Sequence, residues 1–130
     1  MKTFKLLTLV MMIALGATVT TYAQTITTDV TIVELSQTPG AFETTALTLK
    51  PGKYQFKVTN ASVAKDVGFV IQAASDKNGD VMKTAIPNSF GEALIAEGET
   101  TTTGIVELKA GEYVYSCPLN PTPKYTLTVK

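Results

Sequence analysis

The residues with the clearest potential for chemistry in this chain are one cysteine, Cys117, and one methionine, Met82. Cys117 is the only cysteine, and Met82 is the only methionine outside residues 1–23. Thiolate and thioether sulfurs are the soft ligands that Cu(I) prefers, so the two residues are a candidate metal site. Two other interpretations of Cys117 stay open: a redox-active or dimer-forming thiol, and an inert thiol buried in a core.

The residue types that the sequence lacks exclude several kinds of site. There is no histidine and no arginine. Without imidazole there can be no Ser-His-Asp triad, no Cys–His dyad and no His-ligated zinc or copper. A single cysteine excludes an internal disulfide and an iron–sulfur cluster held by this chain alone. We therefore predict that the protein is not an enzyme and carries no cofactor, with copper as the alternative.

A short acidic segment, residues 76–80, places oxygen ligands at alternate positions, as a calcium loop does. Its glycine falls one place early, and Pro87 stands where such a loop has its final acidic ligand. Asn78 followed by Gly79 is a strong hairpin-turn dipeptide. We therefore interpret the segment as a turn.

The first residues, 1–23, have the features of a cleaved secretory signal. Lysines precede an apolar run over residues 6–17, and a small-x-small cleavage site ends at Ala23. The run is shorter than the roughly 20 residues of a membrane-spanning helix. We expect residues 1–23 to be a signal peptide and residues 24–130 to be one domain, periplasmic or secreted, with no membrane span after cleavage.

The charge of residues 24–130 is slightly negative. The chain has 11 lysines and 11 acidic residues, and Lys2 and Lys5 lie in the signal segment. Nucleic acids and anionic lipid surfaces are bound by basic patches, so we expect neither as a partner. A protein partner in the periplasm remains open.

The hydrophobic pattern of the domain is that of β structure, because apolar and polar residues alternate in short runs. Strands are predicted over residues 26–35, 47–50, 54–59 and 67–72. Within residues 82–95 only a short helical turn is expected, since Pro87 and Gly91 limit a helix.

One internal repeat links two parts of the chain. The segment LKPGKYQF at residues 49–56 returns as LKAGEYVY at residues 108–115. Each copy predicts a strand, a glycine turn and a second strand with aromatic residues two positions apart. Two related β-arches in a domain of this size predict an all-β, two-sheet Greek-key β-sandwich. By period two, Tyr113, Tyr115 and Cys117 share a face, which directs Cys117 into the core.

The stretch over residues 47–130 resembles the cupredoxins, the small β-sandwich proteins of the blue-copper type. The segments that carry the resemblance are LKPGKYQFKVTN, VGFVIQ, AEGETTTTGIVELKAGEYVYSCP and the final YTLTVK. The resemblance implies a cupredoxin-like fold and a secreted setting.

The copper ligands of that family are two histidines, a cysteine and often a weak axial methionine, and only Cys117 carries over. Lys65 and Asp66 lie near the place of one family histidine, and Lys124 lies near the other. A protonated lysine cannot ligate a metal. These charges either fill the vacated site with a salt bridge or lie solvated in loops. We predict a cupredoxin-like binding or structural module that has lost type 1 copper. The alternative is an atypical copper-binding or electron-transfer protein that uses Cys117 with Met82 or a partner's ligands.

Overall fold

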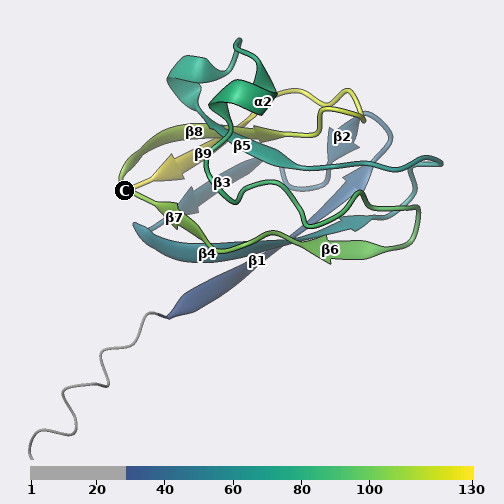
Figure 1. The fold of residues 1–130 in the computed structure, drawn as a ribbon, viewed down its shortest axis with the longest axis horizontal. Coiled ribbons are helices and arrows are strands. Elements are labelled where there is room, and N and C mark those ends of the chain that lie inside the picture. The colour runs from purple at the N-terminus through teal and green to yellow at the C-terminus, as the bar shows by residue number, and fades with distance from the viewer. Residues whose placement is uncertain (1–28) are drawn as a thin grey trace, which may run out of the picture.

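The computed structural model describes residues 29–130 (Figure 1). The predicted signal peptide and its cleavage after Ala23 lie outside these residues. Within residues 29–130, no helix has the length and apolar character to cross a membrane.

Two sheets packed face to face form the domain, as predicted from the sequence (Figure 1). The first sheet contains β1 (Val30–Thr38), β2 (Ala41–Phe42), β4 (Gly52–Asn60), β6 (Thr100–Thr102) and β7 (Val106–Leu108). The second runs in the order β3 (Ala46–Leu49), β9 (Tyr125–Val129), β8 (Gly111–Ser116) and β5 (Val70–Ala73). A 3₁₀ turn (Ala74–Asp76) and α2 (Val81–Thr84) follow β5.

The pairing within the sheets is mixed. β1 runs parallel to β4, and β3 runs parallel to β9. The remaining strand pairs are antiparallel. At one edge of the first sheet, β7 pairs with β4.

The core lies between the sheets and is built by alternation along the strands. On β4, Tyr54, Phe56 and Val58 are buried, whereas Lys57 points to solvent. Removal of such apolar side chains from water is the main favourable contribution to folding. Aromatic rings interlock at the centre, where Phe42 meets Tyr115 edge-on with ring centroids 5.2 Å apart.

The predicted strands over residues 47–50 and 54–59 are found as β3 and β4, and the other two differ in their bounds. β1 continues to Thr38, because Leu35 and Gln37 keep the inward alternation opposite β4. β5 begins only at Val70. The apolar run starts earlier, but Val67 pairs with Ile95 through two backbone hydrogen bonds instead of with β8.

The internal repeat corresponds to two β-arches, and each arch crosses from one sheet to the other. β3 leads into β4, and β7 leads into β8. In the first arch the Tyr54 hydroxyl donates to the Lys50 carbonyl at 2.5 Å. In the second, Tyr113 donates to the Lys109 carbonyl at 2.8 Å. The repeated sequence therefore encodes the same closing hydrogen bond twice.

The segment after β5 is a turn, as predicted, although it does not join two strands of a hairpin. Asn78 and Gly79 lie between the 3₁₀ turn and α2, not between two strands. The reason is local, since the Asp80 carboxylate caps α2 by accepting from the Met82 N–H at 2.8 Å. The short helical turn expected within residues 82–95 is this helix, one residue earlier than the predicted window.

Candidate functional site

Cys117 follows directly after β8 and is buried, with 4 % of its surface exposed. Tyr115 on the same strand face is fully buried, and both residues belong to the central hydrophobic cluster. The inward direction predicted for Cys117 is therefore confirmed.

The sulfur of Cys117 is held by backbone groups from two loops. Sγ accepts a hydrogen bond from the Gly68 N–H at 3.2 Å and another from the Asn120 N–H at 3.0 Å. The Cys117 N–H donates to Thr122 Oγ1 at 3.1 Å, which closes the loop after β8. The thiol thus joins this loop to the segment that precedes β5.

A buried pair of amide side chains surrounds this arrangement. Asn120 Nδ2 donates to Gln37 Oε1 at 3.1 Å and to the Thr38 carbonyl at 3.0 Å, and its Oδ1 accepts from the Gly40 N–H at 2.8 Å. Gln37 Nε2 donates to the Gly68 carbonyl at 2.6 Å. Gln37 is 0 % and Asn120 2 % exposed. This amide network closes the Cys117 end of the sandwich with every polar group partnered.

Neither Gln37 nor Asn120 was among the candidates from the sequence. A signal for Gln37 exists, because it continues the inward alternation of β1 two residues after Leu35. Asn120 lies in a loop three residues after Cys117, where the alternation of β8 no longer applies.

The residues around Cys117 do not make up the type 1 copper set. Such a site places two imidazoles beside the thiolate, and this chain has no histidine. Val67, the residue before Gly68, is fully buried, and its side chain has no atom that could ligate a metal. The amide of Asn120 is already used by Gln37, Thr38 and Gly40. Among residues 29–130, no three Cys, Asp or Glu side chains are grouped so that they could share a metal ion.

Met82, the second candidate ligand, lies on α2 and is 73 % exposed. It lines an apolar groove of about 390 Å³, whose other walls include Gly68, Phe90, Leu94, Pro118 and Leu119. Cys117 lies behind this groove, since the groove is bounded by Pro118, its neighbour in sequence, and by Gly68, which contacts Sγ.

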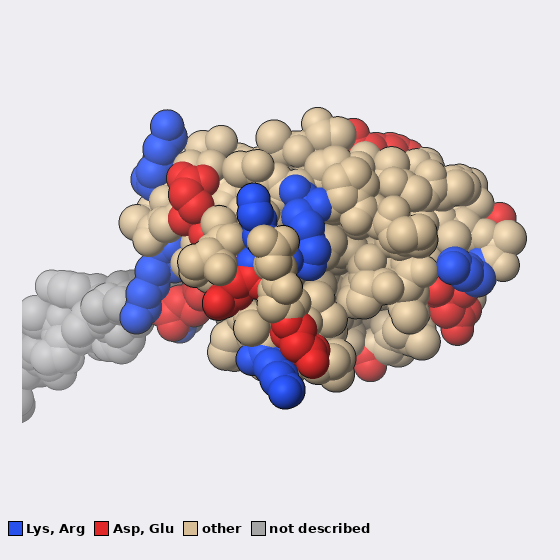
Figure 2. Space-filling view, turned by 90° about the horizontal axis from the view of Figure 1, so that it is seen from above, with Lys and Arg blue, Asp and Glu red and all other residues tan. Residues whose placement is uncertain are grey.

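The lining of the groove contains no charged side chain. Figure 2, which views the molecule from the side of α2, shows charged side chains gathered in the left half and a wide area to their right with few lysine, aspartate or glutamate side chains. Four exposed apolar side chains line the groove: Met82, Phe90, Leu94 and Leu119.

The charged residues that the sequence predicted near the positions of the family histidines have different hydrogen-bond partners. Lys65 and Asp66 are exposed, and Lys65 contributes its backbone carbonyl to Asn60 Nδ2 at 2.9 Å. The Lys124 ammonium donates to Gln72 Oε1 at 2.7 Å, and Gln72 is fully buried on β5. Lys124 therefore connects the last loop to β5.

The phenol of Tyr115, in the core, has a pKa above its ordinary value. Burial, together with the neighbouring Tyr125, raises the pKa of Tyr115 to about 12. Its hydroxyl donates to the Thr44 carbonyl, so the neutral form is the one that the core accommodates.

Comparison with known proteins relates the chain to others through its fold. No family model and no curated protein matches the sequence. Auracyanin A, a "blue" copper protein from the green thermophilic photosynthetic bacterium Chloroflexus aurantiacus, superposes with a TM-score of 0.63 and 18 % identity, covering 78 % of this chain and all of its own.

Two more auracyanin structures are similar. Auracyanin B gives a TM-score of 0.61 at 19 % identity, over 80 % of this chain and 91 % of its own. The dithionite-reduced auracyanin of Roseiflexus castenholzii gives 0.59 at 17 % identity, over 77 % of this chain and 97 % of its own. With its two packed sheets, and with Cys117 at the end of an aromatic strand, the chain has a cupredoxin-like fold.

Proposed function

We propose that this protein is a periplasmic or secreted module that uses the cupredoxin-like fold for binding and has lost type 1 copper. The observation that carries this proposal is the amide network of Gln37 and Asn120. These two side chains hydrogen-bond each other and nearby backbone groups at the Cys117 end. A type 1 site needs imidazole there.

A protein-binding role is supported by the apolar groove. Met82, Leu94 and Leu119 are 73 %, 59 % and 43 % exposed and border one hollow. Exposed apolar side chains that gather in one patch are typical of interaction sites, whereas scattered ones are ordinary. The extracytoplasmic location rests on the signal features of residues 1–23.

The test of the lost copper site is an anaerobic copper titration of the reduced protein, followed by visible spectra after oxidation. We expect no stoichiometric Cu(II) binding and no intense visible band. Auracyanin A, described as a blue copper protein, is the positive control. An intense visible band at one copper per chain would overturn the proposal.

A second candidate function is Cu(I) binding by Cys117 with Met82. Its support is positional, because Gly68 both lines the groove that holds Met82 and donates its N–H to Cys117 Sγ. A Cu(I) competition titration separates the two functions. If Cys117→Ala and Met82→Leu each weaken tight Cu(I) binding at least about tenfold, the second function replaces the first; equal binding by both variants and the parent excludes it.

A further inference from the structure

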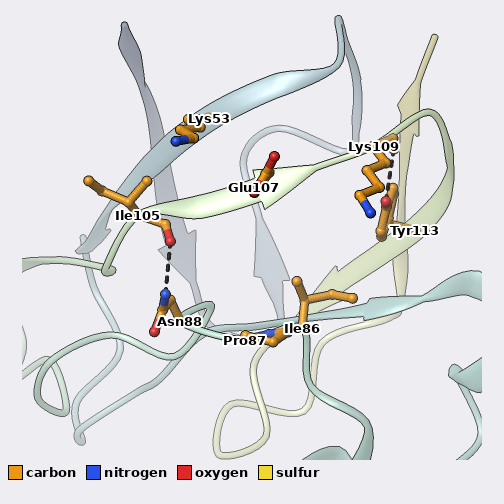
Figure 3. Close-up of a pocket in the computed structure, with 8 residues that line it drawn as sticks. All are labelled: Lys53, Ile86, Pro87, Asn88, Ile105, Glu107, Lys109 and Tyr113. Atoms are coloured by element: carbon orange, nitrogen blue, oxygen red, sulfur yellow. Dashed lines mark hydrogen bonds between the residues drawn. The ribbon is translucent and has the colours of Figure 1, made fainter. Parts of the chain in front are cut away.

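A second hollow lies near the other end of β8, beside the edge strand β7 (Figure 3). Its volume is about 550 Å³, within the range of small-molecule sites. Tyr113 lines this cavity, and Cys117 follows four residues later. At about 3.3 Å per strand residue, the two positions are roughly 13 Å apart. The cavity is therefore separate from the thiol and its amide network.

The walls of the cavity are held by specific contacts. On one side, the Ile86 N–H donates to the Ile71 carbonyl at 2.8 Å, which ties the wall to β5. Asn88 Nδ2 donates to the Ile105 carbonyl at 3.0 Å and ties the same segment to the start of β7. Asn88 has a φ of 68°, a left-handed conformation that asparagine tolerates better than most residues. The hollow is thus framed by both sheets.

The tyrosine of the second arch is more exposed than the equivalent tyrosine of the first arch. Tyr54 and Tyr113 make equivalent hydrogen bonds to the lysine carbonyl four residues earlier. Tyr54 is only 7 % exposed, whereas Tyr113 is half-buried and lines the cavity. Ile105 at the cavity is 46 % exposed. Apolar and aromatic side-chain surface is therefore exposed at the second arch, whereas the equivalent tyrosine of the first arch is buried.

One of the two lysines that line the cavity has no acidic residue across from it in the pairing of β7 with β4. Glu107 stands directly across from Lys53 in the pairing of β7 with β4, a favourable cross-strand arrangement. Lys109 lies beyond the end of β7, where that register assigns it no acidic partner. Figure 3 shows Lys109 with Tyr113 at one end of the cavity, and Lys53 with Ile105 at the other. The three charged side chains together give the lining a net positive charge.

We propose that this cavity binds a small organic carboxylate with an apolar body. The Lys109 ammonium faces the carboxylate, while Ile86, Ile105 and the ring of Tyr113 contact the apolar part. Lys109 is exposed, so its ammonium adds a modest attraction for the carboxylate, and the apolar walls add contact with the rest of the ligand. This inference does not rest on the proposed function, because the cavity and Cys117 are at different places on β8.

The test uses 2-naphthoate as the probe and follows the backbone amide resonances of the isotope-labelled protein by NMR. We expect saturable one-to-one shifts at Ile86, Asn88, Glu107 and Tyr113. The uncharged analogue 2-naphthamide is expected to bind at least about fivefold more weakly. Absence of saturable binding, or shifts centred on the groove residues Met82 and Leu94, would overturn the proposal.

Variants of single charges test the role of Lys109. Lys109→Gln is expected to weaken 2-naphthoate binding about fivefold, whereas Glu107→Gln strengthens it, because a repelling carboxylate is removed. Lys57→Gln is the matched control. It changes the net charge of the protein by the same amount, but Lys57 lies on β4 and does not line the cavity. Equal weakening by Lys109→Gln and Lys57→Gln would show general attraction to the protein charge, and would contradict a site at Lys109.

Discussion

Asn120 donates its backbone N–H to Cys117 Sγ at 3.0 Å, and its side-chain amide donates to Gln37 Oε1 at 3.1 Å. One residue therefore connects the loop after β8 with both the thiol and the end of β1. The resemblance to the cupredoxins implies a type 1 copper at this end, beside Cys117. Here the same end is closed by hydrogen bonds between neutral groups.

Substitution Asn120→Ala is expected to lower the free energy of unfolding by about 2–4 kcal/mol, because buried partners lose their hydrogen bonds. Gln37 Oε1, the Thr38 carbonyl and the Gly40 N–H are the groups affected. Urea denaturation measures the change. Asn78→Ala, at an exposed turn, is the control and should stay within about 0.5 kcal/mol. A loss below about 1 kcal/mol for Asn120→Ala would mean that the network contributes little.

The thiol of Cys117 is expected to react slowly with a thiol reagent such as DTNB. It is 4 % exposed, and Sγ is covered by the N–H groups of Gly68 and Asn120. We expect labelling in the native protein to be at least about a hundredfold slower than in urea, since reaction requires local opening. Stopped-flow absorbance measures both rates. Comparable rates in the two conditions would show that the sulfur is accessible in the folded state.

Removal of the Lys124 side chain is expected to cost about 1–2 kcal/mol of stability, because its ammonium is a partner of the buried Gln72 Oε1. The control is Lys65→Ala. Lys65 is exposed and takes part through its backbone carbonyl, which the substitution keeps. Thermal or urea unfolding should therefore show a larger loss of stability for the Lys124 variant than for Lys65→Ala. Equal effects would mean that the contact of Lys124 with Gln72 does not stabilise the fold.

Alkaline pH is expected to destabilise the protein through Tyr115. Its pKa in the folded state is raised to about 12, whereas an unfolded tyrosine titrates near 10. The unfolded state then holds fewer protons in this interval. The contribution of Tyr115 is fully present below pH 10 and is lost as the pH rises toward 12.

The measurement is the urea midpoint between pH 9 and 12 for the parent and for Tyr115→Phe. The variant loses the hydrogen bond to the Thr44 carbonyl, so it is less stable at neutral pH. Its midpoint should nevertheless fall less steeply with pH, because the shifted group is absent. The same slope in both proteins would contradict the raised pKa.

Much of the architecture follows from local sequence patterns. The repeat at residues 49–56 and 108–115 predicted two related arches, and the structure shows the same tyrosine–lysine hydrogen bond in both. The alternation of β8 determined the inward direction of Cys117. Such features are predictable because side-chain direction in a strand depends on period two, and because similar sequence segments form similar local structures.

The surroundings of the thiol were decided by tertiary structure alone. Gln37 and Asn120 are 83 positions apart, and Lys124 and Gln72 are 52 positions apart. Each pairing depends on which loops meet at an end of the sandwich. Alternation along one strand carries no information about that meeting. The sequence by itself therefore determined the sandwich, its arches and a buried cysteine, whereas the contacts between distant segments decided that amides close the Cys117 end and that Lys124 is bound at β5.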